Sequence, residues 1–224
     1  MALPLNLEEQ EQVDALKSFW ARFGGLITWA LVLVLGAMAA WNGWNYWQRT
    51  QSIKASALYD EIERAVVSKD SDRLARVLAD MQSQFGGTAM ADQGTLLAVK
   101  SMAESGKADA AKAALQWVSE QSRDEAYRAV ARLRLSALHL DAKAYDQALS
   151  VLQAPMPKAF DALLADRRGD IYKAQGKHDE ARQQYQAAWL AFDDRVEYRN
   201  LVAVKLAALG VDAETLASPS ENVR

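Results

Sequence analysis

Catalytic and metal-binding sites draw on histidine, cysteine, serine and acidic side chains held close together, and this chain offers few such combinations. It has no cysteine and two histidines, His139 and His178, which helical periodicity places in different helix pairs. The segment His178–Glu180 has the pattern of a solvated first helical turn, with acidic residues at its positive end. The HExxH, phosphate-loop and GxSxG motifs are absent. We therefore expect no catalytic, metal or cofactor site, and a protein that is not an enzyme.

The elements that could position binding residues begin with an apolar segment near the N-terminus. Phe23–Trp47 contains no charged residue and is flanked by Arg22 and Arg49. A helix of roughly 20 apolar residues is long enough to cross the hydrocarbon core of a bilayer. Aromatic residues cluster at both ends, as is typical at membrane interfaces: Phe19, Trp20 and Phe23 before the span, and Trp41, Trp44, Tyr46 and Trp47 after it. This pattern predicts one transmembrane anchor.

Two other interpretations of this segment remain open. A buried core helix is also apolar all round, but aromatic clusters at both ends are uncommon there. A cleavable signal peptide fits the length of Leu26–Gly36 and the small-residue pattern of Ala37–Ala39. The acidic character of the preceding flank argues against cleavage, so we favour an uncleaved anchor. Positive residues are nearly balanced on the two sides, and the charges alone leave the orientation open.

The composition of the chain narrows the classes of partner. The formal net charge is −3, and basic and acidic residues are interspersed along the chain. No basic stripe indicates nucleic-acid binding, and no polybasic run beside the anchor indicates recognition of anionic lipids. The missing cysteines exclude disulfides and thiolate metal sites. A protein-binding or structural role remains.

Beyond the anchor the chain is predicted to form helix pairs separated by short turns. Ala165–Tyr172, followed by Gly176, Ala181, Tyr185 and Ala188, matches the tetratricopeptide pattern, in which small residues let two helices cross closely. We expect Gly169 and Ala181 to meet at that crossing. The same places one repeat earlier are taken by Ser136, Ala148 and Leu152, and further upstream by Gly106, Ala111 and Leu115.

The predicted fold is all-α, with one N-terminal transmembrane helix followed by a tetratricopeptide-like α-solenoid. An alanine-rich helical bundle without a superhelix is the alternative. The expected boundaries are a short tail over 1–22, the anchor over 23–47, the repeat domain over 48–217 and a flexible tail over 218–224.

The whole chain resembles the YfgM-like family, the ancillary subunits of the bacterial SecYEG translocon. The resemblance rests on Glu11–Lys17 before the anchor, Gly43–Trp47 at its exit, Leu133–Leu135 and Ala165–Asp170. It implies an inner-membrane, single-pass protein with a cytoplasmic N-terminus and a periplasmic repeat domain. It also implies association with the SecYEG translocon and the periplasmic chaperone PpiD, and assistance in transferring exported client proteins to periplasmic chaperones.

Two surfaces are candidates for binding. Gly36, Ala40 and Gly43 form a small-residue face on the anchor that would let another membrane helix approach closely. The first helix of each repeat lines the concave side of a solenoid. This predicts a protein-binding groove whose candidate residues are Lys100, Leu133, Leu140, Asp166, Asp170 and Lys173.

The predicted function is thus a membrane-tethered protein-binding module at the translocon. The alternatives are a structural tetratricopeptide scaffold for another cell-envelope complex, and a periplasmic accessory protein released by signal-peptide cleavage.

Overall fold

The computed structural model describes the backbone of residues 7–216 and the side chains of residues 17–216. The predicted flexible tail at 218–224 lies outside this range. The chain divides into two compact units, Met1–Gln51 and Ser52–Arg224. We describe each unit separately.

The first unit consists of the larger part of helix α1 (Leu7–Val67). In the described part of the chain this is the one helix long and apolar enough to cross a membrane, and almost none of its most apolar window is buried. Leu33 and Trp41, for example, are 70% and 69% exposed. A helix that exposes such side chains all round needs an apolar environment. Helix α1 also continues beyond Trp47 without a break.

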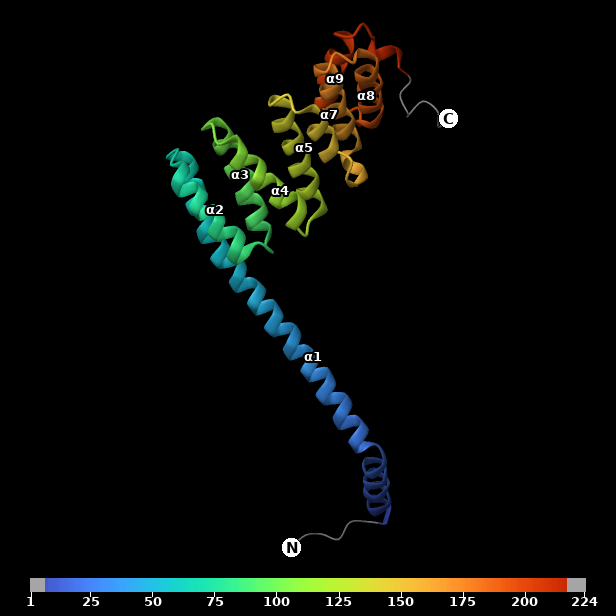
Figure 1. Cartoon of the computed structure of the whole chain (residues 1–224). Helices are drawn as coiled ribbons and strands as arrows, with labels where there is room; N and C mark the ends of the chain where they lie inside the picture. Colours follow the sequence, from blue (N-terminus) through green and yellow to red (C-terminus); the bar gives the residue numbers. More distant parts are fainter. Residues whose placement is uncertain (1–6, 217–224) are drawn as a thin grey trace. The chain divides into compact units, whose positions relative to one another are not determined.

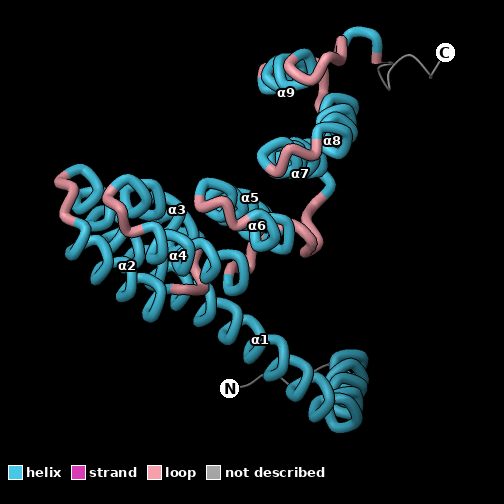
Figure 2. The backbone as a smooth tube through the Cα atoms, turned by 45° about the horizontal axis from the view of Figure 1, so that its top comes forward, coloured by secondary structure: helices cyan, strands magenta, loops and turns pink. Residues whose placement is uncertain are grey.

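The second unit begins with the last turns of α1 and is built from helices joined by short connections, as Figures 1 and 2 show. Its further elements are α2 (Ser71–Phe85), α3 (Ala89–Glu104), α4 (Ala108–Gln121), α5 (Glu125–Asp141), α6 (Tyr145–Val151), η1 (Lys158–Phe160), α7 (Asp161–Ala174), α8 (His178–Ala191), α9 (Tyr198–Ala207) and η2 (Ala213–Thr215). No strand occurs among residues 7–216. The predicted all-α class is confirmed.

Helix ends lie where the sequence provides caps and turns. Asp70 Oδ1 accepts a hydrogen bond from the Arg73 backbone N–H at the start of α2, at 3.0 Å. Thr88 caps α3 in the same manner. After α3 and α7 the chain turns at Gly106 and Gly176, whose φ angles of 76° and 77° strongly favour glycine.

Among the described residues, the core of this unit consists of three hydrophobic clusters that follow one another along the chain. The largest runs from the end of α1 to α5 and includes Ile62, Met81 and Leu115. A second joins α6 to α7 through Leu152 and Ile171, and a third joins α7, α8 and α9. Because each helix buries its apolar side chains mainly against its neighbours, the unit has the organisation of a solenoid.

Tyr185 packs against Gly169 where α7 and α8 cross. A Cβ atom added at Gly169 would lie 2.5 Å from Cε1 of Tyr185, and all three of its nearest atoms belong to that ring. Ala181 is fully buried, but it is Tyr185 that covers Gly169. Glycine therefore lies against an aromatic ring at this crossing. The predicted meeting of Gly169 with Ala181 stays a prediction.

Candidate protein-binding surfaces

A groove of about 670 Å³ lies between the end of α1, the turn that follows it, α3 and α5. We call it the α3–α5 groove. Its apolar lining comes from Val66, Leu96, Leu97 and Tyr127. Three basic residues, Lys69, Lys100 and Arg134, also line it, and all three are exposed. Because α1, α3 and α5 are the first helices of successive pairs, this is the face on which the sequence predicts binding.

Hydrogen bonds between α3 and α5 hold the walls of the groove. Gln93 Nε2 donates to the Tyr127 hydroxyl oxygen at 2.6 Å. Arg134 Nη1 donates to the Leu96 carbonyl oxygen at 2.9 Å, which fixes the guanidinium at the groove wall. The two bonds join residues more than 30 positions apart in the sequence. Contacts within the protein therefore join the two walls of the groove.

Of the predicted groove residues, Lys100 lines the α3–α5 groove. Its Nζ lies 3.9 Å from Glu104 Oε1, and the two side chains are 81% and 68% exposed. An exposed pair at this distance contributes little to stability. The charge of Lys100 is therefore accessible to a partner.

Leu133 and Leu140 lie at a different place. Both are half-buried and pack against the cluster of Ala148, Leu152 and Ile171. Their contacts join α5 to α6 and α7, which is a role in the fold of the repeat. Lys173 is exposed on α7 and does not line the α3–α5 groove.

Asp166 and Asp170 belong to a polar network that joins α7, α8 and α9. Lys205 Nζ lies 2.7 Å from Asp166 Oδ1 and 2.8 Å from Asp170 Oδ1. The Tyr198 hydroxyl donates to Asp166 Oδ2 and the Tyr185 hydroxyl to Asp170 Oδ1, both at 2.8 Å. Burial, together with these carboxylates, raises the pKa of both tyrosines above its usual value, so both hydroxyls remain donors.

This network changes the expected role of Asp166. The residue is 2% exposed and its carboxylate is fully engaged by Lys205 and Tyr198. Asp166 therefore does not present a charge to a partner, although the sequence prediction placed it in the binding groove. The prediction missed this because the lysine that neutralises it lies 39 positions away, on another helix.

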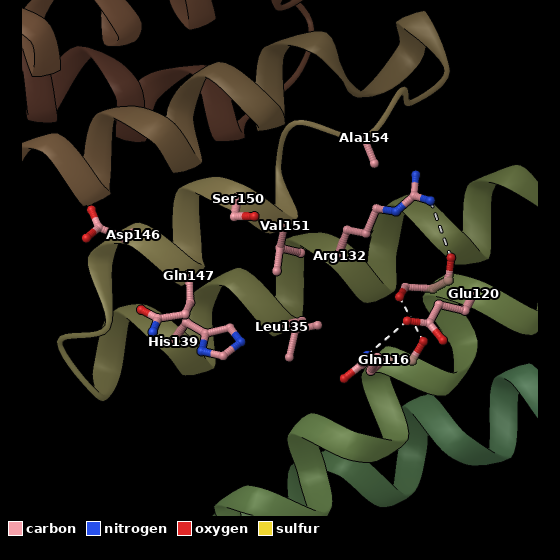
Figure 3. A pocket seen from close by; sticks show the side chains of 11 residues that line it. Gln116, Glu120, Arg132, Leu135, His139, Asp146, Gln147, Ser150, Val151 and Ala154 are labelled. Atoms are coloured by element: carbon pink, nitrogen blue, oxygen red, sulfur yellow. Dashed lines mark hydrogen bonds between the residues drawn. The ribbon is translucent and has the colours of Figure 1, made fainter.

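A second pocket, of about 620 Å³, lies between α4, α5 and α6, and its labelled side chains are drawn in Figure 3. Some of its polar groups bond to other groups of the protein. Arg132 Nη1 donates to the Pro155 carbonyl oxygen at 2.8 Å, and Gln116 Nε2 donates to Glu120 Oε1 at 2.9 Å. Burial lowers the pKa of His139, which favours the neutral imidazole.

Sequence reasoning missed this second pocket because it considered only the first helix of each pair. The available signal was the polar pair Gln116 and Glu120, four positions apart on one face of α4. Within the described range, no group of three or more histidine, aspartate and glutamate side chains is placed to hold a metal ion.

On α1, the small-residue face is open. A Cβ atom added at Gly36 or Gly43 would meet no other atom within 4 Å, and Ala40 is exposed. Among the described residues of this unit, no element covers the face. Another helix could therefore approach it closely.

Comparisons with known proteins agree with this architecture. The model of the family described as tetratricopeptide repeat-like domain matches residues 17–211. A protein of Neisseria gonorrhoeae named ancillary SecYEG translocon subunit is 30% identical over 91% of this chain and 98% of its own length. Proteins of the same name from Haemophilus influenzae and Escherichia coli are 31% and 28% identical, over 82% and 80% of this chain and 89% and 86% of their own lengths. No solved structure matches.

The residues matched by the family model cover the apolar helix and the helix pairs that follow it. The chain therefore belongs to the family of tetratricopeptide repeat-like proteins whose curated members are named ancillary SecYEG translocon subunits.

Proposed function

We propose that this protein is a membrane-tethered binding module that associates with the SecYEG translocon and has no chemistry of its own. The observation that carries the proposal is the match, over 91% of the chain, to a protein named ancillary SecYEG translocon subunit. The apolar part of α1 serves as a single anchor in the bacterial inner membrane. The N-terminal tail lies in the cytoplasm and the helix pairs lie in the periplasm.

The finer role is to receive exported proteins as they emerge and to assist their transfer to periplasmic chaperones, PpiD among them. The α3–α5 groove supports this role because it offers an apolar surface with basic side chains on a rigid frame. Tethering raises the local concentration of the groove at the channel exit, so a weak intrinsic affinity is sufficient.

Contact with the translocon is assigned to the anchor. The face of Gly36, Ala40 and Gly43 packs on a transmembrane helix of the partner, since small residues permit the van der Waals contact on which association in lipid depends. In this arrangement α1 positions the protein at the channel, and the solenoid binds the emerging chain.

The test is site-specific photo-crosslinking in living cells, with partners identified by mass spectrometry. A photoreactive residue at Leu97, in the groove, should crosslink to exported proteins. The same residue at Gln183, exposed on α8, is the matched control and should not. Crosslinks from Leu97 only to components of another envelope complex would favour the scaffold alternative. If the intact mass of the purified protein matches a chain that begins at Ala40, the anchor is cleaved.

A further inference from the structure

The α3–α5 groove carries a charge opposite to that of the chain as a whole. The protein has a formal net charge of −3, whereas the groove is lined by Lys69, Lys100 and Arg134 against a single acidic residue, Glu104. The three basic residues come from three different elements: the turn after α1, α3 and α5. The positive charge is thus distributed across the groove and is not confined to one helix.

These charges are available to a ligand. Arg134 uses one of its five N–H donors on the Leu96 carbonyl, which orients the guanidinium while other donors remain. Lys100 is bound only weakly, to Glu104, at 3.9 Å. A carboxylate from a partner would meet a guanidinium that is already oriented, and it therefore needs little reorganisation of the protein to bind.

The apolar part of the groove lies beside these charges. Leu97 and Tyr127 are half-buried and pack on the main core cluster, which includes Leu96 at 9% exposure. A groove that combines partly exposed apolar side chains with distributed positive charge is complementary to a chain segment with apolar and acidic side chains in alternation.

We propose that the α3–α5 groove binds extended polypeptide segments in which acidic side chains stand next to apolar ones, an inference that rests on the proposed role in receiving exported chains. The carboxylates are those of internal aspartate and glutamate residues. Because the three basic groups come from separate elements, successive side chains of an extended segment can meet them one after another. Binding through the terminal carboxylate alone is the competing outcome of the test.

The test is fluorescence anisotropy with the full-length protein in detergent and a short labelled peptide that contains glutamates and leucines. A peptide with glutamine in place of glutamate, and one with serine in place of leucine, should each bind about tenfold more weakly or worse. Amidation of the C-terminus should leave binding unchanged. If amidation alone abolishes binding, the terminal carboxylate is the ligand and the proposal is wrong.

Charge-reversal variants test whether the basic residues of the groove bind the peptide. Lys100→Glu combined with Lys69→Glu should weaken binding of the acidic peptide at least about tenfold and should improve binding of the peptide that carries lysines instead. The matched control is Lys158→Glu, which changes an exposed lysine outside the groove and should leave both affinities unchanged. Unchanged melting temperatures show that each variant is folded.

Equal binding of the acidic, neutral and basic peptides, or equal effects of the groove and control variants, would overturn this inference. Such a result would leave the proposed function standing if Leu97 still crosslinks to exported proteins. Absence of those crosslinks together with normal peptide binding would instead count against the proposed function and leave the ligand preference intact.

Discussion

The ring of Tyr185 occupies the space that a side chain at Gly169 would need. A Cβ atom at Gly169 would lie 2.5 Å from Cε1 and 2.6 Å from Cδ1 of that ring. The ring cannot move aside easily, because Tyr185 is fully buried and its hydroxyl is held by Asp170 at 2.8 Å. The pair therefore sets how closely α7 and α8 can approach.

From this contact we expect Gly169→Ala, and more strongly Gly169→Leu, to destabilise the solenoid. Alanine gains about 1 kcal/mol of helix propensity over glycine. Overpacking a rigid core costs about 1–3 kcal/mol. We expect this cost to exceed the gain in helix propensity, because the Tyr185 ring cannot yield. Thermal unfolding followed by circular dichroism measures the difference.

The control is Ala174→Leu, an exposed position on the same helix, which should change stability by less than about 0.5 kcal/mol. Ala181→Leu should also destabilise, since Ala181 is fully buried on α8. Melting of both Gly169 variants at the parent temperature would mean that α7 and α8 do not cross at this residue.

We next expect that replacing Lys205 by methionine will loosen α9. Lys205 lies between Asp166 and Asp170, with side-chain exposures of 16%, 3% and 23% for the three residues. Removing one partner from a buried ion pair leaves an uncompensated charge, which costs about 3–5 kcal/mol. Hydrogen exchange of α9 amides, and the unfolding midpoint in urea, should both report the change.

Lys173→Met provides the comparison, because it removes the same charge at an exposed position of α7. It should be nearly neutral. If both variants lose the same stability, general charge balance and not the network accounts for the effect.

The pH dependence of stability should show the cost of a buried carboxylate at Asp92. This residue is 4% exposed, its Oδ2 accepts a hydrogen bond from Ser122 at 2.7 Å, and its Oδ1 has no partner. Burial raises the pKa of Asp92 above its usual value. The folded state therefore binds the proton of Asp92 more tightly than the unfolded state, and the protonated carboxyl contributes to stability at low pH. This contribution is lost as the pH rises from about 4 through the raised pKa.

Asp92→Asn removes the charge and keeps an oxygen that can accept from Ser122. At pH 7 we expect the variant to be more stable than the parent by on the order of 1 kcal/mol. The difference should disappear below about pH 3, where the parent is also neutral. Unfolding curves at several pH values test this, and a difference that does not change with pH would contradict it.

Local features of the chain were predictable from sequence because they depend on neighbouring residues. The ends of α2 and α3 follow from Asp70 and Thr88, and the turns after α3 and α7 follow from Gly106 and Gly176. The repeat of small residues indicated which helices cross. The all-α solenoid that follows a long apolar helix could therefore be predicted from the sequence.

The binding surface was harder to predict because it depends on pairs that are distant in sequence. Asp166 was expected to face a partner, but Lys205 neutralises its charge and Tyr198 donates a hydrogen bond to it, both from another helix. Arg134 was not predicted at all, although its bond to the Leu96 carbonyl places it in the groove. Periodicity shows which face of a helix is polar, but not which polar residue finds a partner within the protein.

Topology gives a further prediction. A reporter enzyme that is active only in the periplasm, fused after Arg224, should be active, and a reporter that requires the cytoplasm should be inactive there. This follows from the proposed orientation, in which a single crossing by α1 puts the N-terminus in the cytoplasm and the C-terminus in the periplasm. Fusions at the N-terminus should give the reverse pattern. Cytoplasmic activity from the C-terminal fusion would invert the proposed orientation and exclude contact between the groove and exported chains.

The last prediction concerns the anchor. If the face of Gly36, Ala40 and Gly43 packs on a helix of the translocon, Ala40→Leu should reduce co-purification of the translocon in mild detergent. The cause is steric, since association in lipid depends on close contact that a larger side chain prevents. Insertion should survive, because leucine is at least as apolar as alanine.

Two comparisons separate packing from mere anchoring. Leu33→Ala lies three positions before Gly36, partly on the same side of α1, and should affect co-purification more than Val34→Ala, which points elsewhere. Replacing Phe23–Trp47 by an unrelated membrane helix tests the whole face at once. If the foreign helix recovers the translocon as well as α1 does, the solenoid alone must hold the partner. In that case the exposed small residues of α1 reflect only the composition of a membrane span.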